Sequence, residues 1–313
     1  MKKSVSIIIP SWNGKKLLEK NLPFLLKALK NTEISNEVII VDDGSTDDTE
    51  NFIKENYPEI KFIKLKTNCG FAHACNVGVL NSTNSIIYLL NNDVQVTDGF
   101  LEPVIKHFEK KDTFAVNSRE ITIDRKNMDL HFLNWIEFKF GIFWNYYKEV
   151  KEPLNLPVYI FAVSGGHSAF DKEKFLSLGG FDEMYSPIYW EDVDICYRAW
   201  KRGWKSIYES KSEVYHFAQS TIRRKYKEFY RKSIHWKNRF LFTWKNLKDT
   251  DLLFQHILFL PGSLIIALFH RPFFTFGFLF ALLHLDEVIK NRRREKNKNL
   301  VSDKKILELF KRK

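Results

Sequence analysis

Three clusters of acidic residues offer the side chains best suited to chemistry in this sequence. Asp42-Asp43 directly follow a short apolar run, Asp93 ends the Asn91-Asn92-Asp93 turn after another, and Glu191 to Asp194 open a run with helical spacing. Ligands in open α/β sheets bind beyond the carboxyl ends of the strands, so the first two clusters fall where sites are usually found. Carboxylate oxygens there suit a hard divalent cation, which commonly carries substrate phosphates. For Asp93 taken alone, a polar turn at a strand end is an equally good interpretation.

The acids at 191–194 suggest proton transfer. Glu191 and Asp192 occupy the predicted first turn of a helix, where the helix dipole favours the ionised form, and such a carboxylate can accept a proton from an attacking hydroxyl. Asp194 lies about 200° around the helix from Asp192, so only one of the two is expected to face a substrate. The alternative is a solvated helix start. His216 could add an imidazole to the same rim, although a lone histidine is more often structural.

Alternating elements along the first hundred residues must position these side chains. Short apolar runs predict buried strands, and the leucine- or alanine-rich segments between them predict connecting helices. Such crossovers imply an α/β fold with a mainly parallel, doubly wound sheet. Pro23 is expected to kink or split the first helix. The predicted strands are Val5–Ile9, Glu37–Val41, Ile60–Leu65 and Ile86–Leu90; the predicted helices are Lys15–Asn31, a short one capped by Ser45 or Thr46, and Ala72–Leu80.

The rest of the chain is less regular. Residues 119–157 are rich in aromatic side chains without clean periodicity. A packed insertion is the favoured interpretation, and the wall of an acceptor cleft is the alternative. Helices are predicted over Phe100–Phe108 with Asp98 as cap, over Asp171–Leu178 and from Glu191 to about Arg202, and strands over Val158–Val163, Lys205–Tyr208 and Val214–Phe217.

Length and composition set the broad class. A chain of 313 residues can hold one large domain with an appendage, or two domains. A hydrophobic content of 44% and a mean hydropathy of -0.30 favour a soluble, well-cored protein. Three cysteines without CxxC spacing indicate a reducing compartment. The first apolar run ends at Pro10, too short for a signal peptide, so the N-terminus is expected in the cytosol.

Positive charge is concentrated in the C-terminal third. Residues 223–245 carry nine Lys and Arg against one acid, and residues 290–313 carry eleven against three. Between them lie two apolar runs, Leu252–Phe269 and Phe273–Leu285. Each falls short of the roughly 20 residues that a spanning helix needs, and Pro261-Gly262 is expected to break the first. Interfacial or re-entrant helices on an anionic membrane are predicted, with a soluble helical subdomain as the alternative.

Several nucleotide-binding classes are excluded by missing loops. No Gly-x-Gly-x-x-Gly follows the first predicted strand, and no Gly-Lys-Ser/Thr loop occurs. A bound diphosphate would then need a metal, and Asp93 is its best-placed ligand. A nucleotidyltransferase, one alternative, would need a Gly-rich basic loop that Pro10 to Gly14 does not provide. A nucleic-acid-binding protein would explain the basic charge but not the acidic rim, so no nucleic-acid partner is expected.

Taken together, six motifs carry a specific resemblance. Each is weak alone, but they occur in one order across residues 5 to 217, and the chain resembles family-2 glycosyltransferases with the GT-A fold, in particular their rhamnosyltransferase-like branch. The motifs are Ser6-Ile7-Ile8-Ile9-Pro10-Ser11-Trp12-Asn13, Val41 to Asp47, Asn68-x-Gly70-Phe71-Ala72 with Asn76 and Gly78, Leu90-Asn91-Asn92-Asp93, Gly179 to Glu183, and Trp190 to Asp194.

The resemblance implies inverting transfer of one sugar from a nucleotide sugar to an acceptor hydroxyl, with Mn²⁺ or Mg²⁺ on the donor diphosphate. Asp93 matches the metal-binding acid, and His216 a histidine that can complete the metal site. Asp192 matches the catalytic base, with Glu191 as its nearer rival. The remaining implied donor-site residues are Pro10 and Asn13 near the nucleotide, Asp42 or Asp43 on its base or ribose, Asn76 in the donor pocket, and Asn92 in the metal motif.

The resemblance implies that residues 1–220 form a GT-A nucleotide-sugar-binding and catalytic domain. The basic and aromatic stripe and the apolar runs beyond it predict that residues 221–313 form a helical, membrane-associating extension. The donor would be dTDP-rhamnose or a UDP-hexose. The acceptor would be a saccharide or lipid-linked saccharide at the inner face of the cell membrane, in cell-surface polysaccharide synthesis. No Gln-x-x-Arg-Trp motif of processive synthases follows the predicted base, so one sugar per encounter is expected. The mechanism requires residues 93 and 192 to face one crevice.

Overall fold

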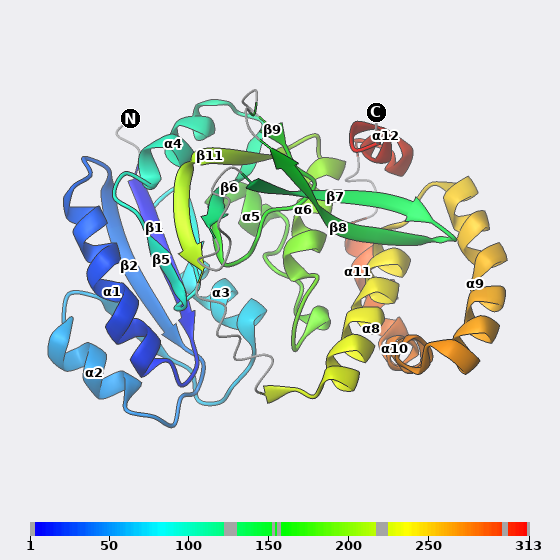
Figure 1. Cartoon of the computed structure of the whole chain (residues 1–313), viewed down its shortest axis with the longest axis horizontal. Helices are drawn as coiled ribbons and strands as arrows, with labels where there is room; N and C mark the ends of the chain where they lie inside the picture. The colour runs from blue at the N-terminus through cyan, green and yellow to red at the C-terminus, as the bar shows by residue number, and fades with distance from the viewer. Residues whose placement is uncertain are drawn as a thin grey trace.

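A mixed sheet forms the centre of the computed structural model, which describes residues 4–121, 130–151, 154, 158–216, 225–295 and 300–311 (Figure 1). In this part of the chain the sheet has the order β3-β2-β1-β4-β10-β6-β11-β5, with β9 paired to β11. The strands are β1 (Ser4–Ser11), β2 (Ser35–Asp42), β3 (Lys61–Lys64), β4 (Ile86–Leu90), β5 (Val94–Val96), β6 (Thr113–Ile121), β9 (Val158–Tyr159), β10 (His167–Asp171) and β11 (Lys205–His216).

The mainly parallel α/β sheet predicted from the sequence is confirmed. β3, β2, β1, β4, β6 and β11 run in one direction, while β10, β5 and β9 run against them. Ile7 of β1 lies between Val38 of β2 and Tyr88 of β4. Since these strands are parallel, their carboxyl ends meet at one edge of the sheet.

Apolar residues on both faces of the sheet explain the continuous runs in β1 and β4. Ile7 and Ile9 belong to a core under α1 (Lys15–Lys30), α2 (Thr49–Asn56) and α4 (Leu101–Lys106), whereas Ile8 packs with α3 (Phe71–Leu80) on the other side. Successive side chains of a strand point to opposite faces, so a strand covered on both sides is apolar throughout. That second core also includes α5 (Lys172–Ser177) and α6 (Glu191–Lys201).

Several predicted helix boundaries are wrong. α1 is not split at Pro23, because that residue lies on the exposed face, where water can bond the carbonyl that loses its partner; the alternative of a kink there stays a prediction. α2 begins after Asp48 rather than at Ser45 or Thr46. The Ser45 hydroxyl is used elsewhere: it bonds Asp42 and accepts the Asn13 N–H at 2.7 Å. The residue preceding α4 is Phe100, so Asp98 does not cap it.

The strands after residue 110 also differ from the prediction. β6 and β10 were not predicted, and of Val158–Val163 only Val158–Tyr159 is a strand. The two short strands expected near residues 205 and 214 are one strand, β11, with an irregularity between Glu209 and Glu213 that hides its period. The predicted strand residue Phe217 lies outside the described residues.

An antiparallel hairpin of β7 (Leu130–Lys139) and β8 (Ile142–Lys151) occupies much of the aromatic region 119–157. Its Phe143 is fully buried, with ring centroids 5.5 Å from Tyr197 of α6 and 5.3 Å from Phe242 of α8 (Glu228–Asn246). The expected packed insertion is therefore confirmed for the described hairpin. Residues 122–129, 152, 153 and 155–157 of this region lie outside the description.

The C-terminal helices after α8 are α9 (Thr250–His270), α10 (Pro272–Leu282), α11 (Leu285–Arg294) and α12 (Asp303–Leu309). The predicted break at Pro261-Gly262 is wrong: α9 runs through it for 21 residues, and the exposed proline loses only one internal hydrogen bond. α9 is long and apolar enough to cross a membrane, and only 17% of its most apolar window is buried. In Figure 1 it stands apart from α8 at the edge of the molecule.

Candidate active site

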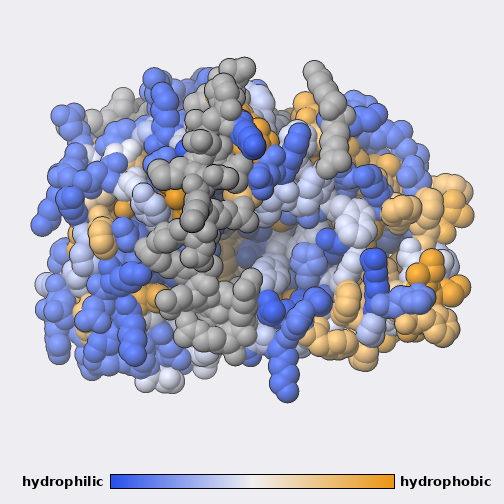
Figure 2. Space-filling model, viewed as in Figure 1, coloured by the Kyte–Doolittle hydropathy of each residue, from blue (hydrophilic) through white to orange (hydrophobic). Residues whose placement is uncertain are grey.

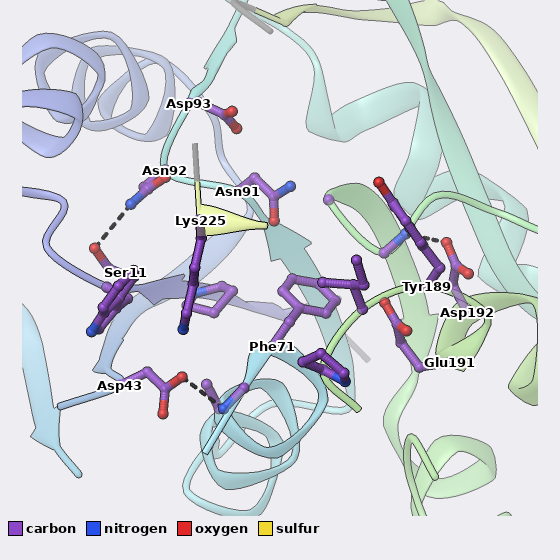
Figure 3. Close-up of a pocket in the computed structure, with 18 of the residues that line it drawn as sticks. Ser11, Asp43, Phe71, Asn91, Asn92, Asp93, Tyr189, Glu191, Asp192 and Lys225 are labelled. Atoms are coloured by element: carbon purple, nitrogen blue, oxygen red, sulfur yellow. Dashed lines mark hydrogen bonds between the residues drawn. The ribbon is translucent and has the colours of Figure 1, made fainter. Parts of the chain in front are cut away.

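A cleft of about 380 Å³ opens where the carboxyl ends of β1, β2 and β4 face the start of α6 (Figure 3). Residues 93 and 192 both line it, so the expectation that they share one crevice is confirmed. Of the residues singled out from the sequence, those lining the cleft are Pro10, Asp43, Asn92, Asp93, Glu191, Asp192 and His216.

Strand pairing brings Asp93 and His216 together. The turn Asn91-Asn92-Asp93 leads from β4 into β5, and β5 pairs with the end of β11, where Val94 lies opposite His216. The Nε2 atom of His216 is 3.5 Å from Oδ1 of Asp93. Asn92 fixes the turn by donating from Nδ2 to the Ser11 hydroxyl at 2.9 Å. An acid and an imidazole thus meet at one end of the cleft.

Glu120, which sequence reasoning missed, contacts His216 at Nδ1, the ring nitrogen that does not face Asp93. Its Oε1 atom is 3.3 Å from Nδ1 of His216, and its Oε2 is 3.4 Å from Nε2 of the buried His167. Burial alone would raise the pKa of Glu120, but the hydrogen bonds from the two histidines hold it below its ordinary value. Contacts with Asp93 and then Glu120 raise the pKa of His216 to about 10. No local motif marks Glu120, because its partners come from β10 and β11.

The ligand set fits a metal that is bound together with a diphosphate. Asp93 and His216 supply one carboxylate oxygen and one imidazole nitrogen. Within the described ranges no group of three or more His, Cys, Asp and Glu side chains could hold a metal ion by itself. Ions such as Mg²⁺ are commonly held by one or two carboxylates plus substrate phosphates. Two protein ligands at the edge of an open cleft suit that arrangement.

Glu191 and Asp192 stand at the other end of the cleft (Figure 3). The Asp192 carboxylate accepts the N–H of Val193 at 2.8 Å and, from the loop before β10, the N–H of Gly165 at 3.3 Å. Burial raises the pKa of both acids, and the charge of Asp192 adds to the effect on Glu191, whose pKa rises to about 8. A carboxylate with a raised pKa is a stronger base once ionised, which suits it to accept a proton from a hydroxyl.

Asp194 faces away from the cleft, so the expectation that only one of Asp192 and Asp194 faces a substrate is confirmed. Asp194 is fully buried and pairs with Arg198 of α6 at 2.7 Å and with Lys245 of α8 at 2.8 Å. Asn246 and Tyr185 also donate to it. The C-terminal helix α8 therefore anchors the helix that presents Asp192.

The loop entering α6 is held by the same helix. Tyr189 and Trp190 have φ values of 69° and 82°, in the left-handed region that side chains disfavour. Nδ2 of the buried Asn238 of α8 lies 2.8 Å and 2.9 Å from the carbonyl oxygens of Ile188 and Tyr189. A strained loop persists when its surroundings over-determine it, and here it aims Glu191 and Asp192 at the cleft.

Three of the sequence-derived residues do not line the cleft. The Asn13 side chain accepts the Thr46 N–H at 2.8 Å, and the buried Asp42 bonds Ser45. Asn76 clamps Phe181 by accepting its N–H and donating to its carbonyl, both at 2.9 Å. Their side chains brace the loops around the cleft, and a direct role in donor binding stays a prediction for each.

Asp43 and the pair of Trp12 and Lys225 also line the cleft, and the sequence did not predict Lys225 there. Asp43 accepts the N–H groups of Cys69 and Gly70 at 2.7 and 2.8 Å, which fixes the loop beside the cleft. The Lys225 ammonium lies 4.1 Å from the ring centroid of Trp12, and both residues line the cleft. Trp12 stands in the first of the six motifs, whereas the sequence signal at Lys225 was the basic-aromatic pattern around it, which had suggested an anionic surface instead.

Comparisons with solved structures show the fold. A crystal structure of GalNAc-T7 with UDP, GalNAc and Mn²⁺ superposes with a TM-score of 0.61 at 17% identity, covering 78% of this chain and 48% of that one. The mannosyltransferase PcManGT from Pyrobaculum calidifontis, in complex with GDP-Man and Mn²⁺, gives a TM-score of 0.55 at 16% identity, covering 95% and 89%. The expected GT-A fold is confirmed.

Sequence comparisons show the family. Polypeptide N-acetylgalactosaminyltransferase 8 of Drosophila melanogaster is 27% identical over 226 residues, covering 68% of this chain but only 38% of the fly protein. The N-acetylglucosaminyl-diphospho-decaprenol L-rhamnosyltransferase of Mycobacterium tuberculosis is 26% identical over 226 residues, covering 64% and 73%. The model of the family described as "Glycosyl transferase family 2" matches residues 6–178. That match covers more than half of the sequence, and the chain belongs to glycosyl transferase family 2.

Proposed function

We propose that this chain is an inverting, metal-dependent glycosyltransferase that moves one sugar from a nucleoside-diphosphate sugar to a hydroxyl of a saccharide or lipid-linked acceptor. The observation that carries the proposal is the arrangement of the cleft, with Asp93 and His216 at one end and Glu191 and Asp192 at the other. Inverting transfer needs a group that receives the leaving diphosphate and a base on the opposite side of the sugar. Both kinds of group face this cleft.

The donor end would hold the nucleoside diphosphate and Mn²⁺ or Mg²⁺. The bound metal would neutralise the charge that develops on the leaving diphosphate. Asp93 and His216 would be its protein ligands, and Glu120 would keep the Nε2 atom of His216 turned toward the metal by bonding Nδ1. Pro10, Asp43 and Asn92 would contact the nucleotide. Two structural neighbours that contain a nucleotide or nucleotide sugar with Mn²⁺ support this arrangement.

At the acceptor end Asp192 would act as the base. Its carboxylate would take the proton of the acceptor hydroxyl as that oxygen attacks the anomeric carbon from the face opposite the diphosphate, which inverts the centre. The Gly165 N–H keeps the carboxylate oriented. Glu191 is the rival for this role, and its charge raises the electrostatic cost of ionising the pair.

The relatives narrow the donor and acceptor only by class. A rhamnosyltransferase and a poly-β-1,6-N-acetyl-D-glucosamine synthase of Staphylococcus epidermidis, 24% identical over 221 residues, support a place in cell-surface polysaccharide synthesis. The donor would be dTDP-rhamnose or a UDP-hexose. A lipid-linked acceptor would agree with the name of the mycobacterial relative, which acts on a diphospho-decaprenol.

Membrane attachment would be supplied by the C-terminal region. We propose that residues 1–220 form the catalytic domain and that residues 221–313 attach it to the inner face of the cell membrane. Figure 2 shows hydrophobic side chains gathered at the end of the molecule where α9 and α10 lie. The exposed apolar residues of α9 include Phe254, Ile257, Leu258, Ile265, Ile266, Leu268 and Phe269. Basic residues of α11, the helix that follows α10 in the chain, include Arg293 and Arg294 and suit anionic headgroups.

A screen of nucleotide sugars tests the proposal. Purified protein is incubated with Mn²⁺ or Mg²⁺, a panel of dTDP-, UDP- and GDP-sugars and saccharide acceptors, and the release of nucleoside diphosphate is measured. We expect one donor class to be used, release to stop with EDTA, and Asp93→Ala to weaken metal-dependent donor binding. Absence of release with every donor, together with salt-sensitive binding of nucleic acid, would contradict the proposal.

A further inference from the structure

Lys225, in the segment that leads into α8, brings a cation into the catalytic cleft. It is the only lysine or arginine among the described residues that line the cleft. The acids of the same lining are Asp43, Asp93, Glu191 and Asp192. A nucleoside diphosphate is an anion, so these carboxylates repel it when it binds in the cleft. Because His216 is a predicted metal ligand, the Lys225 ammonium is the side-chain cation left to offset that repulsion.

The contacts of Lys225 leave room for an anion. No carboxylate of the described residues forms an ion pair with it. Its Nζ atom lies 4.1 Å from the ring centroid of Trp12 and donates to Oδ1 of Asn68 at 3.1 Å. An ammonium has three N–H donors, and the amide oxygen accepts one of them. The aromatic face attracts the charge without using the other donors as an oxygen acceptor would, so they stay available to a ligand.

Both residues that hold the ammonium belong to the donor end of the cleft. Trp12 follows β1 and Asn68 follows β3, and the turn that contains Asp93 follows β4. These strands are parallel, so the three loops meet at one edge of the sheet. Figure 3 shows the Lys225 side chain extending into the cleft on the side of Asn92 and away from Asp192. The free N–H donors therefore lie at the end where the diphosphate is expected.

Cleavage of the donor increases the negative charge at this end. As the acceptor oxygen bonds to the anomeric carbon and its proton passes to the base, the bond from that carbon to the diphosphate breaks. The electron pair stays on the diphosphate oxygen, so the product diphosphate carries more negative charge than the nucleotide sugar. A cation already fixed at this place stabilises the charge as it develops. The protein ligands predicted for the metal, Asp93 and His216, include one carboxylate, so a further cation suits this end.

We propose that the Lys225 ammonium binds the diphosphate of the donor and of the nucleoside diphosphate product, while Trp12 and Asn68 hold it in the cleft. The inference rests on the proposed glycosyl transfer and adds a donor-site residue that no motif in the sequence assigns. Charge selects the diphosphate as the occupant. A nucleobase or a sugar ring would leave the ammonium without a counter-charge, whereas phosphate oxygens accept its free N–H groups in charge-assisted hydrogen bonds.

Calorimetry with UDP, dTDP and GDP in the presence of Mn²⁺ tests the contact without turnover, on the full chain in a neutral detergent. Lys225→Gln removes a charge-assisted hydrogen bond and should weaken whichever diphosphate binds the parent by about tenfold. Lys225→Arg keeps the charge and can stack on Trp12, so binding should stay within about threefold of the parent. The control is Lys227→Gln, which removes an exposed lysine of the same segment that does not line the cleft. Its affinity should stay within about twofold of the parent.

Nucleosides separate a phosphate contact from a contact with the base. Uridine, thymidine and guanosine lack the diphosphate, so each should bind the parent and Lys225→Gln alike in ligand-observed NMR. The inference is overturned if Lys225→Gln binds the diphosphates as the parent does, if Lys227→Gln loses as much affinity, or if the nucleosides weaken as much as the diphosphates. A parent that binds none of the three diphosphates would contradict the proposed glycosyl transfer itself. Equal diphosphate binding by the parent and Lys225→Gln would remove only the role of Lys225.

Discussion

Glu120 provides a sharp test of how the metal site is built. Its carboxylate contacts Nδ1 of His216 at 3.3 Å and Nε2 of His167 at 3.4 Å, and it lies behind the predicted ligands rather than among them. If Glu120 fixes the ring of His216, Glu120→Gln should keep the fold but weaken metal binding. Partners of this kind contribute about 10- to 100-fold to metal affinity, or roughly 1.4 to 2.7 kcal/mol.

The charge and the acceptor atoms that each substitution removes decide how large its effect on metal affinity should be within this range of about 10- to 100-fold. Glutamine keeps one acceptor oxygen for Nδ1 of His216 but loses the charge, so we expect about a tenfold loss for Glu120→Gln. Alanine leaves His216 and His167 without this partner, so we expect about a 100-fold loss for Glu120→Ala. Free Mn²⁺ is measured by electron paramagnetic resonance in the presence of saturating nucleoside diphosphate, which reads binding without turnover.

The chain contains a matched control. Glu209 of β11 forms the same kind of pair, with Oε2 2.6 Å from Nε2 of His107, away from the cleft. Glu209→Gln should leave Mn²⁺ affinity within about twofold of the parent, because its histidine faces no predicted ligand. Equal Mn²⁺ affinity in Glu120→Ala and Glu209→Gln would refute the positioning role of Glu120.

Four further outcomes follow from the acids of α6. Asp192→Asn should abolish transfer while leaving metal-dependent donor binding near normal by calorimetry, and near-normal turnover would refute its role as base. Because burial raises the pKa of Asp192, kcat/KM should rise as the pH passes through that raised pKa and then level off. The charge of Asp192 raises the pKa of Glu191 further, to about 8, so Glu191 is still neutral while Asp192 ionises, and Glu191→Gln should leave the rise in place; loss of the rise in that variant would assign the base to Glu191. Asp194→Asn should lower the free energy of unfolding by about 3 to 5 kcal/mol in urea titrations, because Arg198 and Lys245 lose a buried counter-charge, and a loss below about 1 kcal/mol would contradict the anchoring.

Local sequence patterns were enough to predict secondary structure where the composition of a segment determines it. The apolar runs of β1 and β4 are covered on both faces, so their composition alone marks them as strands. β10 was missed because the histidine and serine with which it begins are ordinary loop residues, and it is a strand only because β4 and β6 flank it. The break expected at Pro261 failed for a related reason: proline disfavours a helix interior, but an exposed turn tolerates the loss of one bond.

The roles of single residues depended on distance in space rather than in sequence. Asn76 carries a motif position, yet the fold uses its side chain to clamp Phe181. Glu120 carries no motif, because it acquires its significance from His167 and His216, which other strands bring to it. No local pattern could have found it.

By itself the sequence determined the α/β class and the family and predicted roles for the acids at positions 93 and 192, since strand composition and ordered motifs are local properties of the chain. Only the tertiary structure decided that Asp194 is a buried anchor, that α8 holds the loop before Glu191, and that Glu120 contacts His216. The physical reason is that burial and charge pairing are properties of neighbours in space, and in this chain such neighbours can be more than a hundred residues apart, as Asp93 and His216 are.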